Sequence, residues 1–448
     1  MTDIGVEPYR EITFDADGDA DPAERAALTG VDATDLVLFA HGWNNTPTTA
    51  RNLYRAFFAV FPPLLTAAPG VRLAYGGVTW PSIRFTDESI PDFPHALAQT
   101  ADPGLDTATV SALKGFFPGQ DAAVDTIAGY LREQPDSEAA FTDFGRLTRQ
   151  LVTSATSVGS ATRGRPGGGD LALEDAPGAA PALLMDPIVE LCQRFTSALA
   201  ETGMDVQPEQ PGPPEPPGPS FSIGGSLKHL WNGAKEVLRQ TTYYEMKHRA
   251  GTVGQNGLGP LIGQLATTRP DLRVHLVGHS QGARLVAFAL KGLPQGARNL
   301  KSVTLLEGAF SHYVFAERLP DGLSGPGALS DAQARLDGPV VSCYSHFDTA
   351  LGVIYPLASA LSGDYASELP GLDRRWWAIG HDGIQAVSPC TMLTLAEALR
   401  DGVPDSGCVS VDVAAVVKSG GPPTGAHSDI CHPELARVVL AAGRIVSV

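Results

Sequence analysis

The sequence feature that most constrains the fold of this chain is a five-residue motif, Gly-His-Ser-Gln-Gly at positions 278–282, which has the pattern G-x-S-x-G. An apolar run at 273–277 precedes it with the composition of a buried strand, and residues 284–291 behind it have the periodicity of a helix. A serine between a strand and a helix sits on a sharp, strained turn, which needs small residues two positions to either side. The context predicts that Ser280 is a nucleophile presented above the edge of a sheet.

Strand and helix patterns alternate in two parts of the chain. Residues 35–40 are a continuous apolar run, and Thr46 followed by Pro47 has the pattern of a helix N-cap and first helical position. The other strands expected are 71–78, 274–277, 303–306, 340–344 and 409–417, and the other helices are 258–267, 284–291 and 433–442. This alternation predicts the α/β class, with a mostly parallel sheet covered by helices on both faces and a site at the carboxyl ends of the strands.

The stretch between these two parts has a different composition. Residues 163–169 and 208–219 are rich in Gly and Pro and are expected to be loops or linkers. Helices are expected at 185–200 and again behind the proline run, where an apolar stripe favours packing on the core over a mobile lid: Leu227, Leu230, Trp231, Ala234, Val237 and Leu238. We therefore divide the chain into 1–85 and 242–448, two parts of one core, and 86–241, an insertion or cap whose loops need not be ordered.

The composition excludes some classes of partner. The chain has 32 Lys and Arg against 49 Asp and Glu, a formal charge of −17, and such a surface repels nucleic acid and anionic lipid. The N-terminus lacks the pattern of a secretory signal, and no run has the length of a membrane span. The five cysteines are scattered without C-x-x-C spacing, which argues against a zinc site or a disulfide framework. We expect a soluble, cytoplasmic protein without a bound metal.

A serine hydroxyl needs a base that takes its proton as it attacks. Of the 11 histidines, His427 is the best placed, because it lies in the loop between the last expected strand and the final helix. His432 precedes Pro433 and could simply cap that helix, and His381 is a third alternative. We expect His427 to be the base.

The base needs a carboxylate that fixes its tautomer. Asp348 follows the strand expected at 340–344 and gives the chain order Ser, acid, His. Glu307, at the end of the strand expected at 303–306, is the alternative acid. We expect Asp348 to be the acid of a catalytic triad.

The oxyanion that develops during attack needs donors that are already in place. One expected donor is the backbone N–H of Gln281, directly after the serine. The second is the backbone N–H of Trp43, in the loop at 41–45 that follows the first apolar strand. His41 in the same loop is expected to be structural, because the chain order suits His427 better as the base.

These motifs together resemble those of α/β-hydrolases of the lipase and esterase kind. The resemblance rests on Ala-His-Gly-Trp at 40–43, the motif at 278–282, Asp348 and His427, and it covers about 31–81 and 242–448. Residues 243–254 are similar to a segment of a group of uncharacterised bacterial hydrolases in that superfamily. The resemblance implies hydrolysis of an ester or thioester, with no cofactor. Two features depart from the common pattern. Trp43 stands in place of a run of glycines, and a long insertion precedes residue 243, where an insertion in this fold could roof the site.

Three functions fit these residues. The first is hydrolysis of a carboxylic ester, of a small molecule or a lipid, through an acyl-enzyme on Ser280. The second is acyl transfer by the same triad, with an alcohol or amine in place of water, which the sequence does not separate from hydrolysis. The third is a non-catalytic relative that binds a small molecule or a partner, against which stands the presence of all five expected elements of the site.

Overall fold

The fold is built on one eight-stranded sheet in which every pair of neighbouring strands is parallel. The computed structural model describes residues 4–67, 70–82, 104–162, 186–203, 227–320, 325–356, 374, 377–422 and 424–446. The strands are β1 (Tyr9–Thr13), β2 (Asp35–Ala40), β3 (Leu73–Thr79), β4 (Arg273–His279), β5 (Leu300–Leu306), β6 (Pro339–Tyr344), β7 (Cys390–Thr394) and β8 (Gly407–Asp412), in the order β1-β3-β2-β4-β5-β6-β8-β7. The α/β class and the parallel sheet expected from the sequence are confirmed.

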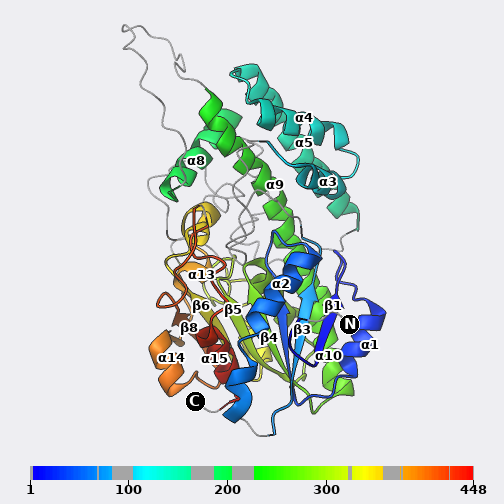
Figure 1. Ribbon diagram of the computed structural model, residues 1–448, viewed down its shortest axis with the longest axis vertical. Helices are drawn as coiled ribbons and strands as arrows, with labels where there is room; N and C mark the ends of the chain where they lie inside the picture. Colours follow the sequence, from blue (N-terminus) through cyan, green and yellow to red (C-terminus); the bar gives the residue numbers. More distant parts are fainter. Residues whose placement is uncertain are drawn as a thin grey trace.

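The central strands are apolar along their whole length because both faces of the sheet are covered. In β2, Leu36 and Leu38 belong to one buried cluster, and Val37 and Phe39 between them belong to another. Helices α1 (Pro22–Thr29), α10 (Gly259–Thr268) and α11 (Gln281–Gly292) contribute to the first cluster, and α2 (Pro47–Phe58), α14 (Leu395–Asp401) and α15 (Pro433–Ala442) to the second. Figure 1 shows α2, α14 and α15 on the near face of the sheet. Successive strand side chains point to opposite faces, so a two-sided core gives continuous apolar runs.

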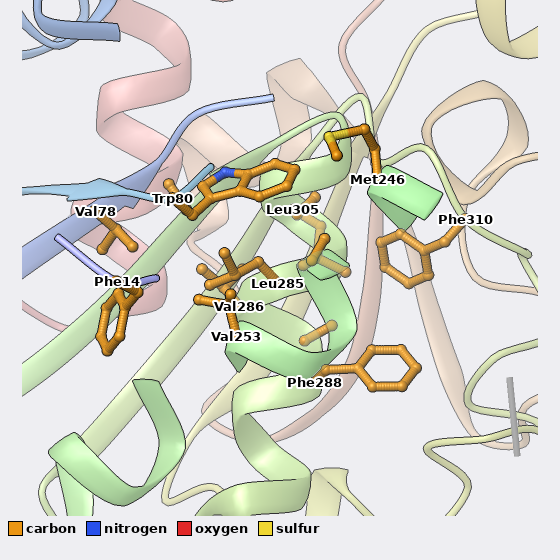
Figure 2. Packing of buried hydrophobic residues seen from close by; sticks show 14 of the residues in the cluster. Phe14, Val78, Trp80, Met246, Val253, Leu285, Val286, Phe288, Leu305 and Phe310 are labelled. Carbon is orange, nitrogen blue, oxygen red and sulfur yellow. The ribbon is translucent and has the colours of Figure 1, made fainter. Parts of the chain in front are cut away.

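The first cluster joins the sheet to the helix behind the serine motif. Figure 2 shows Leu285 and Val286 of α11 beside Trp80 and Leu305 of β5, and Val78 of β3 and Phe288 of α11 belong to the same buried cluster. Met246 of α9 (Leu230–Thr252) and Val253, which opens the short helical turn η3 (Val253–Leu258), lie in the same cluster. The long helix of the central stretch is therefore anchored in the core beside α11.

Helix ends follow the local signals in the sequence. Thr46 caps α2 with a capping box to Thr49, and Pro47 opens the helix.

Strand β8 is shorter than the 409–417 expected, because the chain turns after Asp412. The Asp412 carboxylate accepts the Ala414 N–H at 3.0 Å, and the Val417 N–H donates to the Val413 carbonyl. The expected strand end was therefore wrong by several residues.

The central stretch forms a set of helices beyond the carboxyl ends of the strands (Figure 1). We call α3 (Thr107–Phe116), α4 (Asp121–Glu133), α5 (Glu138–Thr162), α8 (Ile188–Glu201) and the first half of α9 the helical layer. The apolar stripe expected behind the proline run is buried in η2 (Leu227–His229) and α9, and Trp231 stacks on Phe141 at a ring separation of 4.1 Å. That segment is a packed helix, as expected. The Gly/Pro-rich segments 163–169 and 208–219 lie outside the described residues.

Within the described ranges, none of the helices combines the length and the apolar character needed to cross a membrane.

Candidate active site

Ser280 lies at the carboxyl end of β4, at the N-terminus of α11. Its backbone has φ 56° and ψ −121°, a conformation in which a residue other than glycine is strained. The Ser280 N–H donates to the Leu306 carbonyl at 3.1 Å, and the Ser280 carbonyl accepts the Ala283 and Ala309 N–H groups. The turn expected from the motif is thus held from β5 as well as from α11.

The two glycines of the motif are required by close packing. A Cβ on Gly282 would overlap the carbonyl oxygens of Ala40 and His41, and one on Gly278 would overlap the Gly282 carbonyl. The loop after β2 also approaches the serine closely, since a Cβ on Gly42 would lie 2.8 Å from the Ser280 Cβ. Glycine at these positions lets three chain segments converge on Ser280.

Among the described residues, His427 is the histidine whose ring contacts the Ser280 hydroxyl. Its Nε2 lies 2.9 Å from the Ser280 Oγ, and its Nδ1 lies 2.6 Å from the Asp348 Oδ2. The loop that carries His427 is tied to the Asp348 loop: the Ala426 N–H donates to the Phe347 carbonyl, and Gly425, at φ 59°, leaves no room for a side chain against that carbonyl. The two loops, far apart in the sequence, therefore form one unit at the sheet edge.

The other two histidines considered lie elsewhere. His432 pairs with Asp429 at 2.9 Å, at the start of α15. His381 packs edge-on against Trp377, and its Nδ1 lies 3.3 Å from the Asp348 backbone carbonyl. Both act on the segments that hold the site rather than on Ser280.

The two carboxylates considered from the sequence lie side by side. Asp348 is fully buried, and its second oxygen, Oδ1, accepts the Leu351 N–H at 2.9 Å. Glu307, directly after β5, is 1% exposed and interacts with the Asp348 carboxyl. Burial, and then the Asp348 charge, raise the pKa of Glu307 well above its usual range. Asp348 is thus the carboxylate that contacts His427, and Glu307 lies next to it.

His41 holds the loop after β2 and takes no part in the contacts of Ser280. Its Nδ1 lies 2.8 Å from the Gly42 carbonyl, its ring stacks on Trp80 at 5.5 Å, and its carbonyl accepts the Trp80 indole N–H at 2.9 Å. Burial lowers the pKa of His41 to about 4, so the ring is neutral at pH 7. The geometry agrees with the structural role expected for His41.

The two residues expected to stabilise an oxyanion flank Ser280 in different ways. Gln281 is the first residue of α11, where backbone N–H groups have no acceptor within the helix. Its side-chain amide is fully buried and has no hydrogen-bond partner among the described residues. Trp43 follows Gly42 in the loop that contacts Ser280, and its ring meets Tyr243 of α9 edge to face at 5.4 Å.

One residue of the site was not assigned from the sequence. His279, beside the nucleophile position, is fully buried, and its Nε2 lies 2.8 Å from the His427 backbone carbonyl. Burial, and then the neighbouring His427, lower the pKa of His279 to about 3, so the ring is neutral and its Nε2–H donates to that carbonyl. The variable position of a G-x-S-x-G motif carries no signal for such a contact.

The fold and the site together define a class of protein: an α/β protein with a parallel sheet and a Ser-His-Asp hydrogen-bonded chain at the carboxyl edge. No protein-family model, no curated protein and no solved structure matches the chain.

Proposed function

We propose that the protein is a serine hydrolase of the α/β-hydrolase fold that cleaves a carboxylic ester through an acyl-enzyme on Ser280. The observation that carries this proposal is the hydrogen-bonded chain from the Ser280 Oγ through His427 to Asp348, with separations of 2.9 and 2.6 Å. A nucleophile within reach of a base that is itself oriented by a third group is the arrangement that activates a hydroxyl at neutral pH.

In the proposed first half-reaction, the Ser280 Oγ attacks the carbonyl carbon of the ester while the His427 Nε2 takes the hydroxyl proton. Asp348, an acceptor at the His427 Nδ1–H, stabilises the imidazolium that forms. The Nε2 proton then passes to the alkoxide leaving group as the ester C–O bond breaks, and the acyl group stays on the Oγ. Water repeats the sequence on the acyl-enzyme, which releases the carboxylic acid and restores the serine.

The tetrahedral intermediate places a negative charge on the former carbonyl oxygen. We propose that the backbone N–H groups of Gln281 and Trp43 donate to it, because Gln281 opens α11 and Trp43 follows the glycine that contacts Ser280. The positive end of the α11 dipole points at the same place. Donors that are fixed before the reaction are often the largest single contribution to such catalysis.

The helical layer fits the role of a cap over this site. Tyr243, in the α9 helix that continues from that layer, lies near Ser280: its hydroxyl donates to the Ala309 carbonyl at 3.4 Å, and its ring contacts Trp43 and Tyr355. Aromatic side chains beside the proposed oxyanion donors favour an ester with an apolar acyl or alcohol group. An alcohol that replaces water at deacylation would give acyl transfer by the same residues.

A fluorophosphonate probe tests the proposal directly. We expect the folded protein to be labelled and the Ser280→Ala variant to remain unlabelled, with a fall in kcat on short and long p-nitrophenyl esters of about 10⁶-fold. Ser419→Ala, an exposed serine of the loop that also carries His427, is the matched control and should be labelled like the parent protein. Labelling or ester hydrolysis that survives in Ser280→Ala would refute the assignment. Product analysis with added alcohols separates hydrolysis from acyl transfer.

A further inference from the structure

A second carboxyl group lies behind Asp348 and is not used by the proposed reaction. Glu307 is the first residue after β5, and its N–H donates to the Cys343 carbonyl of β6 at 3.1 Å. Its backbone has φ 46°, and Gly380 packs so closely against it that a Cβ there would overlap the Glu307 backbone. Segments from three parts of the chain therefore fix the place from which the Glu307 side chain extends.

The surroundings of the Glu307 carboxyl contain acids and no paired cation among the described residues. Neither Oε1 nor Oε2 has a donor in hydrogen-bond geometry within these residues. The groups that act on it electrostatically are the Asp348 carboxyl, which after burial raises the pKa of Glu307 most, the Asp429 carboxyl with a smaller effect, the Cys343 thiol and the Ser345 backbone N–H. That N–H donates to the Gly380 carbonyl at 3.1 Å, so it compensates a Glu307 charge only weakly.

The contacts of Asp348 decide which of the two carboxyl groups holds a proton. Its Oδ2 accepts from His427 and its Oδ1 accepts the Leu351 N–H, so both oxygens already act as acceptors and Asp348 is the ionised member. Two ionised carboxylates in contact repel each other and cannot share a hydrogen bond, because neither has a donor. A proton on Glu307 removes the repulsion and supplies the donor.

We propose that Glu307 is a neutral carboxylic acid that donates a hydrogen bond to Asp348, and that it is thereby a positioning residue for the proposed triad. A carboxylic acid in an apolar, buried place can stay neutral at pH 7 and act as a donor. The bond holds the Asp348 carboxylate in the orientation that His427 needs. It also limits the negative charge behind His427 to that of Asp348 alone. The positioning role rests on the proposed function, whereas the protonation of Glu307 does not.

Three variants test whether Glu307 is protonated and whether its hydrogen bond positions Asp348. Glu307→Gln keeps the size and a donor but has no acidic proton, and Glu307→Met keeps the volume without a donor. Glu133→Gln removes an exposed carboxylate of α4 and is the matched control. The infrared difference spectrum between the parent protein and each variant at neutral pH reports whether the lost group was a protonated carboxyl or a carboxylate. It requires no turnover.

We expect a protonated carboxyl band that disappears in Glu307→Gln and is unchanged in Glu133→Gln. On a reactive ester, Glu307→Gln should keep kcat within a few-fold and leave the acid limb of the kcat/KM profile in place. Glu307→Met should lower kcat by about 10-fold to 100-fold with little change in KM, the effect of one hydrogen bond to a charged group.

Two results would overturn the proposal. If the difference spectrum shows a lost carboxylate, and the acid limb of Glu307→Gln moves to lower pH by about one unit, Glu307 is ionised in the parent protein. If Glu307→Met, or Glu307→Leu where the Met variant does not fold, loses the carboxyl band while kcat and its pH profile match those of the parent protein, the positioning role is wrong, because neither side chain has a donor. A protonated band in a protein without esterase activity would instead refute the proposed function and leave the protonation assignment standing.

Discussion

The substitution Gly42→Ala tests whether the loop after β2 forms part of the reacting site. A Cβ at this position would lie 2.8 Å from the Ser280 Cβ, 3.2 Å from the His279 carbonyl oxygen and 3.4 Å from the His279 Nδ1. Carbon atoms in ordinary contact are about 3.5–4.0 Å apart, so the loop must move by roughly 1 Å. Gly42 is not among the residues with positive φ, so alanine adds no backbone strain of its own.

A movement of that size matters because the geometry of an oxyanion donor is narrow. Effective donors lie about 2.7–3.1 Å from the oxyanion, and the loss of one costs about 10²-fold to 10³-fold in kcat. Since Trp43 follows Gly42 directly, we expect Gly42→Ala to lower kcat by about 10²-fold to 10³-fold. Crowding in a packed place should lower the free energy of unfolding by only about 1–3 kcal/mol.

The assay compares kcat, KM and urea unfolding of Gly42→Ala with those of Gly129→Ala. Gly129 lies in α4 with no atom within 4 Å of an added Cβ, so its alanine variant should be about 0.5–1 kcal/mol more stable, with kcat unchanged. A Gly42→Ala variant that folds and keeps kcat within about threefold of the parent would refute the reasoning, because the loop would then move without affecting the reaction.

Two further predictions concern buried histidines. His279→Ala removes the donor to the His427 carbonyl and should lower kcat by about 10-fold, while Tm changes by only a few degrees. Equal kcat values in the variant and the parent protein would show that the contact is not needed to hold His427. His275, fully buried, lies 3.0 Å from both Asp35 and Ser302, and burial lowers its pKa below 6.5. Because the folded state binds this proton less readily than the unfolded state, the stabilisation is present above pH 6.5 and is lost as pH falls below that value. Asp35 acts in the same direction: burial alone would raise its pKa, but the hydrogen bonds from His275 and Thr34 outweigh burial, and its contribution is lost below pH 3.8. Urea unfolding of the parent protein between pH 7 and 5 should show the loss of the His275 contribution to the free energy of unfolding. If the free energy of unfolding of a His275→Gln variant fell with pH as steeply as that of the parent protein, the assignment of this loss to His275 would be wrong.

Local signals in the sequence account for much of the fold. Residues 35–40 and Pro433–Ala442 have the bounds expected from apolar runs and proline signals. The edge strands β1 and β7 were not expected, because only one side of each pairs with the sheet and their residues are partly exposed, so they carry neither an apolar run nor a clean alternation. Helices α3, α4 and α5 were also missed, since their apolar residues pack on each other and on α9 rather than on a strand.

The candidate site was also only partly predictable from local signals in the sequence. Ser280 follows from a local requirement, a strained turn flanked by glycines, which a short motif records. The contact of Glu307 with Asp348, and that of His279 with the His427 carbonyl, depend on which strand ends and loops meet in space. No spacing along the chain encodes these contacts, although Glu307 was recognisable as an acid at a strand end. Its role as catalytic acid was the weaker expectation, and the structure places Asp348 rather than Glu307 against His427.

A second Ser-His-Asp chain in the same molecule shows what the three residue types do not establish by themselves. Ser302, His275 and Asp35 are joined by hydrogen bonds of 3.0 Å, but Ser302 and His275 lie within β5 and β4 and are fully buried. Ser302 lies inside a strand rather than on a strained turn, and no helix begins after it. Its hydroxyl is therefore not presented to a substrate, and no helix N-terminus supplies oxyanion donors beside it. Ser280 differs by its place at the carboxyl edge, its positive φ and the N-terminus of α11. The surrounding turn, more than the triad alone, is thus the physical basis for assigning the nucleophile to Ser280, and a fluorophosphonate that labels Ser302 would contradict it.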